Sequence, residues 1–164
     1  MGRPRARRSS PRGATLTVAT VPTKLASQQI VSLRGKAKAS FLLAVQDIRR
    51  RGCAAAGVRL AGDALSGICR LDLYGAWRLL TVFEAPDRCV LLLVAEHTRS
   101  ANPYRLLYEA LGIDEPEEPR TKPSCCDDEG QPPIDTDLIE RFENGLRELG
   151  RGLPASARKR PGRR

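Results

Sequence analysis

The spacing of apolar residues over the first 52 positions predicts a strand followed by two helices. Leu16 to Val21 alternates and is rich in β-branched residues, which is typical of a short strand that ends at Pro22. Thr23 to Leu33 has the apolar spacing of a short helix. The next helix runs for about four turns and ends at Gly52, because its apolar residues recur at intervals of four, three and four positions: Ala37, Phe41, Ala44 and Ile48.

Three strands are predicted after a loop over residues 53–67. Ile68 to Tyr74 alternates apolar and polar residues, as expected for a strand with one buried face. After a turn, Trp77 to Glu84 is predicted to form a second strand that runs back alongside the first. Cys89 to Ala95 is apolar throughout, which predicts an interior strand that is covered on both faces.

Two further helices are predicted beyond the strands. Asn102 and Pro103 are typical of an N-cap followed by proline at the first helical position, and Gly112 ends this helix. In the last helix, Asp137 and Glu140 match the capping-box spacing. A helix of this length is marginal in water, so we expect it to dock on the domain or on a partner.

These elements predict an α+β fold. It has an N-terminal strand and two helices, an antiparallel, partly mixed, twisted sheet of about four strands, a short helix after the last strand and an appended C-terminal helix. The predicted segments are a disordered basic arm (1–15), a folded domain (16–113), an acidic, proline-rich linker (114–133), an amphipathic helix (134–150) and a disordered basic tail (151–164).

Charge is unevenly distributed along the chain, which carries 28 Lys and Arg against 19 Asp and Glu, a net charge of +9. Residues 13–112 hold 13 basic and seven acidic side chains, whereas residues 113–152 hold five and 12. A basic domain before an acidic segment points to a polyanionic partner. An Arg-rich composition is equally expected from a GC-rich genome, so each Arg position has to be argued separately.

The sequence predicts a cytoplasmic, reduced protein without metal or cofactor. No apolar run approaches the roughly 20 residues that span a bilayer, and no apolar signal region follows the basic N-terminus. Five cysteines, an odd number, do not suggest a disulfide framework. Cys69 and Cys89 are expected to be small hydrophobic strand residues, and the adjacent pair Cys125 and Cys126 to be incidental rather than redox-active. A single His and no CxxC motif argue against a zinc site.

Two segments carry a family resemblance. Gly75-Ala76-Trp77-Arg78-Leu79-Leu80 follows a hairpin turn, and Glu96-His97-Thr98-Arg99 precedes Tyr104 at the exit of the last strand. In this order of elements, Leu16 to Ile113 resembles the RelE/ParE superfamily of toxins from bacterial type II toxin–antitoxin systems. That family has an aromatic-Arg-(Leu/Val)-(Leu/Ile) strand, and a His or Lys, an Arg and a downstream Tyr recur at its last-strand exit.

The resemblance implies a domain that is toxic when free and that forms an oligomer with a neutralising, cognate antitoxin. Members of the RelE branch cut mRNA in the ribosomal A site without metal, whereas ParE-branch members poison DNA gyrase and lack the nuclease residues. We therefore expect an endoribonuclease, an mRNA interferase that acts on mRNA at the ribosome. A non-catalytic, ParE-like gyrase inhibitor and a non-toxic interaction module on the same fold are the alternatives.

Carried over by position, Arg70 takes a basic strand position, Arg78 the central Arg, Arg99 the exit Arg and Tyr104 the Tyr. Guanidinium groups match phosphate oxygens two at a time. His97 is the only side chain that titrates near neutrality when unperturbed, so it is the natural base or acid. The predicted catalytic residues are Arg78, Arg99, His97 and Tyr104, and the predicted RNA-binding residues are Arg70, Lys36 and Lys38.

Purely structural roles compete with these assignments. Asp72 is acidic where nuclease members commonly have a second basic residue, and it shares a strand face with Arg70, so both could pair across the sheet. Tyr104 could pack beside Tyr108, and Trp77 is expected in the core rather than on a base-stacking platform. The C-terminal helix is expected to pack on the domain, and covering the basic site is its alternative role.

Overall fold

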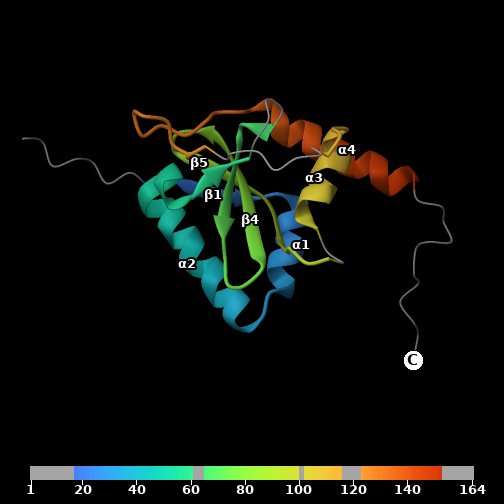
Figure 1. Cartoon of the computed structure of the whole chain (residues 1–164), viewed down its shortest axis with the longest axis horizontal. Coiled ribbons are helices and arrows are strands. Elements are labelled where there is room, and N and C mark those ends of the chain that lie inside the picture. Colours follow the sequence, from blue (N-terminus) through green and yellow to red (C-terminus); the bar gives the residue numbers. More distant parts are fainter. Residues whose placement is uncertain (1–16, 61–64, 100–101, 116–122, 153–164) are drawn as a thin grey trace, which may run out of the picture.

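The computed structural model of the chain describes residues 17–60, 65–99, 102–115 and 123–152. These ranges form an α+β fold with four α-helices and one five-stranded mixed sheet, which confirms the predicted fold class (Figure 1). No helix within them has the length and apolar character needed to cross a bilayer. The predicted basic arm lies outside the described residues, as does nearly all of the predicted basic tail.

The strands and helices follow the predicted order. The strands are β1 (Ala19–Pro22), β2 (Val58–Arg59), β3 (Ile68–Asp72), β4 (Trp77–Ala85) and β5 (Arg88–Glu96). The helices are α1 (Lys24–Ser32), α2 (Gly35–Arg51), the short 3-10 helix η1 (Gly52–Ala55), α3 (Pro103–Leu111) and α4 (Asp137–Gly152).

The sheet has the strand order β1-β5-β4-β3-β2. β1 runs parallel to β5, and the other neighbouring strands are antiparallel. The apolar strand β5 is therefore interior, as predicted. The loop expected over residues 53–67 is wrong in part, because it contains η1 and β2. β2 has only two residues, whose partners are Arg70 and Cys69, and such a short strand leaves no alternation pattern in the sequence.

Local capping sets the helix ends. The Thr23 hydroxyl accepts the N–H of Ala26 at 3.1 Å and donates to the carbonyl of Leu92 at 2.7 Å, so it fixes α1 on the sheet. The Asn102 side chain accepts the N–H groups of Tyr104 and Arg105 at the start of α3. At the start of α4 the predicted cap is wrong. There the carboxylate of Asp135, two residues before Asp137, accepts the N–H of Leu138 at 3.0 Å.

The sheet separates two apolar clusters, and neighbouring β4 residues show the division. Leu79 belongs to the cluster under α2, whereas Leu80 belongs to the cluster under α3 and α4. Because successive strand residues point to opposite faces, the two clusters lie on opposite sides of the sheet. Figure 1 shows α2 and α3 on the two sides of the strands. The fully buried side chains that helices contribute include Ala26 and Ile48 in the first cluster and Leu107, Leu138 and Phe142 in the second.

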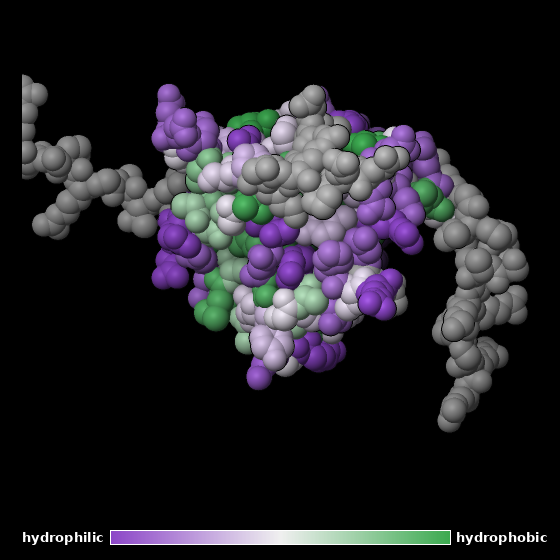
Figure 2. All heavy atoms as spheres, in the orientation of Figure 1, coloured by the Kyte–Doolittle hydropathy of each residue, from purple (hydrophilic) through white to green (hydrophobic). Residues whose placement is uncertain are grey.

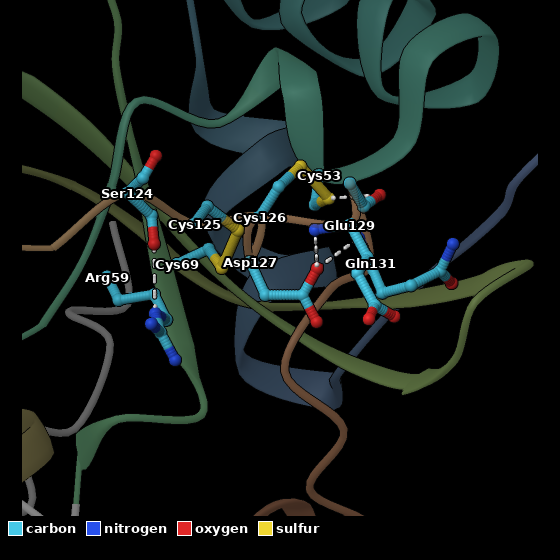
Figure 3. Close-up of a disulfide and its surroundings, with 10 residues drawn as sticks. Cys53, Arg59, Cys69, Ser124, Cys125, Cys126, Asp127, Glu129 and Gln131 are labelled. Carbon is cyan, nitrogen blue, oxygen red and sulfur yellow. Dashed lines mark hydrogen bonds between the residues drawn. A yellow bond between two sulfur atoms is a disulfide. The ribbon is translucent and has the colours of Figure 1, made fainter.

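Two disulfides overturn the prediction of a reduced chain. Cys53 pairs with Cys126 and Cys69 with Cys125, with Cα–Cα distances of 5.4 and 5.6 Å (Figure 3). Cys89 is a buried free thiol. The paired residues lie 73 and 56 positions apart, so their proximity is set by the fold and leaves no local signal. The adjacent cysteines 125 and 126 thus fasten one segment to both β3 and η1.

We call residues 123–135 the strap, because they run along the sheet from β2 to the end of β4. The backbone N–H of Arg59 donates to the carbonyl of Pro123 at 2.8 Å, and its Nε donates to the carbonyl of Ser124 at 2.9 Å (Figure 3). At the other end, the N–H of Asp135 donates to the carbonyl of Phe83 at 3.1 Å. The strap thereby leads the chain onto the sheet just before α4 begins.

α4 is a packing helix, as expected. Its side chains Leu138 and Phe142 are fully buried in the second cluster. Gly145 lies directly against the backbone carbonyl of Ala110 in α3, and a Cβ atom at this position would overlap that oxygen. The glycine that interrupts the apolar stripe is therefore the point of closest approach between the two helices.

α2 carries apolar surface that the described residues leave uncovered. Figure 2 shows hydrophobic atoms along the left side of the view, over α2, while hydrophilic atoms dominate the centre and right. Leu43 is 66% exposed and Leu42 is 49% exposed. Leu43 also lines a shallow groove between α2 and the β3 segment from Arg70 to Leu73.

Candidate functional site

Charged side chains continue one face of the sheet beyond its apolar core. Ile68 of β3 and Leu80 of β4 belong to the cluster under α3 and α4. Arg70, Asp72 and Arg78 follow on the same strands at even spacing, so they point to the same face. Asp72 is the cross-strand partner of Arg78. The three groups therefore gather at the end of the sheet where the β3–β4 hairpin turns.

Asp72 is bound to both arginines. Its Oδ1 lies 3.0 Å from Nε of Arg70 and 3.1 Å from Nε of Arg78. The Arg78 guanidinium also donates to the backbone carbonyls of Gly75 at 3.0 Å and Trp77 at 2.8 Å. The Arg70 and Arg78 side chains are 20% and 21% exposed, whereas Asp72 is 56% exposed. Two mostly covered guanidinium groups are thus held together by one outward-facing carboxylate.

His97 lies next to this cluster. It follows β5 directly, and its backbone N–H donates to the carbonyl of Ala76 at 2.8 Å, so the β4–β5 pairing extends one residue further. Arg78 faces Ala95 in this ladder. His97 and Arg78 are therefore diagonal neighbours on one face, with Cα atoms on the order of 7–8 Å apart.

Tyr104 meets His97 from the first turn of α3. The ring centroids are 5.1 Å apart and the planes make an angle of 83°, which is an edge-to-face contact. Tyr104 is also half-buried against the second apolar cluster, close to Tyr108. Tyr104 can therefore pack on the second apolar cluster and contact His97 at the same time.

A basic hollow opens beside His97. It has a volume of about 560 Å³ and is lined by His97, Thr98, Arg99, Asn102 and Arg105. The side chains of His97, Arg99 and Arg105 are exposed, and the described lining contains no carboxylate. Arg105 was missed by sequence reasoning. The sequence does carry a signal for it, because a residue three positions after the N-cap Asn102 lies in the first turn of α3, close to the end of β5.

The predicted RNA-binding lysines lie on α2. Nζ of Lys36 is 5.3 Å from the ring centroid of Tyr74, a cation–π contact. Tyr74 belongs to the turn between β3 and β4, and its backbone N–H donates to the Ser40 hydroxyl at 2.9 Å. Lys36 therefore reaches the end of the sheet that carries Asp72, but from the α2 side. Lys38 is exposed on the same turn of α2.

The structure thus groups most of the predicted site residues at one end of the sheet. Arg70, Arg78, His97 and Tyr104 lie on the α3 side, and Arg99 joins them through the hollow. Trp77 packs against the first apolar cluster, as expected for a core residue. Among the described residues, no group of three or more His, Cys, Asp or Glu is arranged to hold a metal ion.

This arrangement is suited to anionic ligands. Two guanidinium groups in the hollow can each donate paired hydrogen bonds to phosphate oxygens. An exposed imidazole beside them can accept or donate a proton. The site therefore has the groups needed to bind a phosphodiester and to transfer a proton next to it.

No protein-family model and no curated protein sequence matches this chain. A solved structure with a similar course of the chain is that of the toxin–antitoxin complex RelBE2 from Mycobacterium tuberculosis. The sequences are 21% identical, and the alignment covers 49% of this chain and 99% of the matched chain, with a TM-score of 0.37. A likeness at this TM-score assigns neither a family nor an activity to the chain.

Proposed function

We propose that this chain is a RelE-like toxin that cleaves single-stranded RNA without a metal ion. The observation that carries the proposal is the hollow that joins His97, Arg99 and Arg105 beside the Arg70–Arg78 pair. The strand motifs that resemble the RelE/ParE superfamily lie at this same end of the sheet. A cognate antitoxin and ribosome-bound mRNA follow from the same resemblance and stay predictions. The cytoplasmic location expected from the sequence also stays a prediction.

Metal-free cleavage of RNA requires a base, a charge stabiliser and an acid. His97 takes the proton from the ribose 2′-OH, and the 2′-oxygen bonds to the adjacent phosphorus. Arg99 and Arg105 neutralise the charge that develops on the non-bridging oxygens. The bond from phosphorus to the 5′-oxygen then breaks, and Tyr104 supplies the proton to that leaving oxygen. The products carry a 2′,3′-cyclic phosphate and a 5′-hydroxyl.

The experiment measures cleavage of ribosome-bound mRNA by the purified protein in the presence of EDTA. We expect His97→Ala and Arg99→Ala each to slow cleavage by about a hundredfold or more, because each removes a group that acts in the transition state. Arg141→Ala is the matched control, since it removes one exposed positive charge from α4, away from the hollow. If the double variant of His97 and Arg99 cleaves as fast as this control, the site assignment is wrong.

A non-catalytic inhibitor of a protein target is the second candidate. Asp72 favours the inhibitor. At this position nuclease members commonly have a second basic residue, whereas the Asp72 carboxylate pairs with both Arg70 and Arg78. A ParE-like activity would block DNA supercoiling by gyrase and induce an SOS response while mRNA stays intact. Expression without any effect on growth would favour a non-toxic interaction module instead.

A further inference from the structure

We infer that Arg70 and Arg78 form a phosphate subsite that Asp72 keeps closed as an internal anion. The inference rests on the proposed function, because it names the phosphodiester backbone of single-stranded RNA as the ligand. The subsite lies on the same face of the sheet as His97, the diagonal neighbour of Arg78. An RNA strand bound in the hollow would therefore pass directly beside the phosphate subsite.

The geometry around Asp72 defines one anion position. A single oxygen, Oδ1, lies 3.0 Å from Nε of Arg70 and 3.1 Å from Nε of Arg78, and Nη2 of Arg70 donates to Oδ2 at 3.5 Å. The Nε edge of a guanidinium group matches carboxylate and phosphate oxygens equally well. Both guanidinium groups thus lie within ion-pair distance of one oxygen, and a phosphate oxygen can take the place of that carboxylate oxygen.

The carboxylate is the replaceable member of this group. Arg78 stays fixed when Asp72 moves, because it also donates to the carbonyls of Gly75 and Trp77. Both arginines are about four-fifths covered, whereas Asp72 is 56% exposed and can turn toward water without burying its charge. Ion pairs with an exposed partner contribute little to stability. A phosphate group can therefore displace Asp72 while Arg78 keeps its place.

The test measures binding of a fluorescently labelled 2′-O-methyl oligouridylate, which lacks the 2′-OH and is not cleaved. We expect Asp72→Asn to bind it roughly threefold to tenfold more tightly than the natural protein. The slope of log K against log salt should steepen by about 0.7 for each additional phosphate of the single strand that the variant neutralises. Glu96→Gln is the matched control, because it removes the same charge beside Trp77, on the opposite face, and should change affinity less than twofold.

A second set of variants tests whether Asp72→Asn tightens binding through Arg70 and Arg78. With Arg70→Gln and Arg78→Gln already present, Asp72→Asn should give no further increase in affinity. Asp72→Glu keeps the charge and should bind like the natural protein, and circular dichroism verifies that each variant is folded. The inference is overturned if Asp72→Asn binds no more tightly than Glu96→Gln, or if its tighter binding persists without the two arginines.

The probe also keeps this result apart from the proposed cleavage. If Asp72→Asn tightens binding while ribosome-bound mRNA stays intact with the natural protein, the phosphate subsite is supported and the proposed nuclease function is rejected. If cleavage depends on His97 but Asp72→Asn has no effect on binding, the nuclease function is supported and the subsite is rejected.

Discussion

Asp72 and Arg78 face each other across the β3–β4 ladder, with the carboxylate Oδ1 3.1 Å from the guanidinium Nε. The acid that departs from the expected basic pattern is therefore the partner of the central arginine. Arg78 has a structural task as well, since it also binds the carbonyls of the hairpin turn. Arg99, in contrast, is exposed at the edge of the hollow.

This difference predicts unequal effects on stability. We expect Arg78→Ala to lower the free energy of unfolding by about 1–2 kcal/mol, because two backbone carbonyls lose a donor and Asp72 loses an ion-pair partner. Arg99→Ala should stay within about 0.5 kcal/mol of the natural protein, as surface substitutions usually do. Urea unfolding of both variants gives the measurement. Equal midpoints for the two variants would show that Arg78 does not anchor the hairpin.

Gly145 predicts a sharp packing effect. Gly145→Ala places a methyl group on the carbonyl oxygen of Ala110, so α4 must move away from α3. We expect a loss of about 1–3 kcal/mol, typical of overpacking.

Gly150→Ala is the matched control on the same helix. No atom lies within 4 Å of the position that its new Cβ would take. It should therefore be neutral or stabilise the protein by up to about 1 kcal/mol through helix propensity. If urea unfolding shows equal losses for both variants, the close approach of α3 and α4 is not what fixes Gly145.

The disulfides predict a thiol count. The chain has five cysteines, and four of them are paired. Denatured protein without reductant should therefore expose one reactive thiol, Cys89, and five after reduction. More than one thiol before reduction would contradict the pairing.

Each disulfide should also stabilise the strap. Replacing Cys125 or Cys126 with Ser opens a loop closed over 56 or 73 residues. We expect a loss of about 2–5 kcal/mol for each, since the cross-links restrict the unfolded chain. Thermal unfolding with and without reductant checks this, because reduction should lower the melting temperature of the natural protein more than that of a variant lacking both bonds.

Cys89 predicts how stability falls at high pH. Burial raises the pKa of its thiol from an ordinary value of 9.0 to about 12, and a hydrogen bond with Thr81 opposes this only in part. Above pH 9 the unfolded chain loses this proton and the folded chain keeps it, so the contribution is complete below pH 9 and is lost toward pH 12.

Within this window, each pH unit should cost the natural protein about 1.4 kcal/mol more than it costs Cys89→Ala. Urea unfolding at about pH 10 and about one unit higher measures the difference, because there the unfolded thiol is mostly ionised and the folded thiol is mostly protonated. An identical loss in the two proteins would mean that the Cys89 thiol is not protected from ionisation.

Much of the fold is predictable because its signals are local. Asn102, Pro103 and Gly112 mark the ends of α3, and the structure places this helix at Pro103–Leu111. The parallel pairing of β1 with β5 and the two-residue strand β2 depend on partners far along the chain. The disulfides are missed for the same reason, since adjacent cysteines 125 and 126 carry no trace of partners at 53 and 69.

The candidate site, too, is predictable from the sequence only in part. Strand alternation places Arg70 and Asp72 on one face, and the pairing across the sheet with Arg78 follows from it. Arg105 enters the hollow only because α3 packs at the end of β5, which no periodicity reveals. The edge-to-face contact of Tyr104 with His97 likewise depends on that packing.

The most direct measurement is the chemistry of the RNA ends formed in EDTA, read by mass spectrometry. We expect 2′,3′-cyclic phosphate and 5′-hydroxyl ends with the natural protein, and none above background with His97→Ala. Intact RNA with the natural protein, or the same ends at the same rate with His97→Ala, would contradict cleavage at this site.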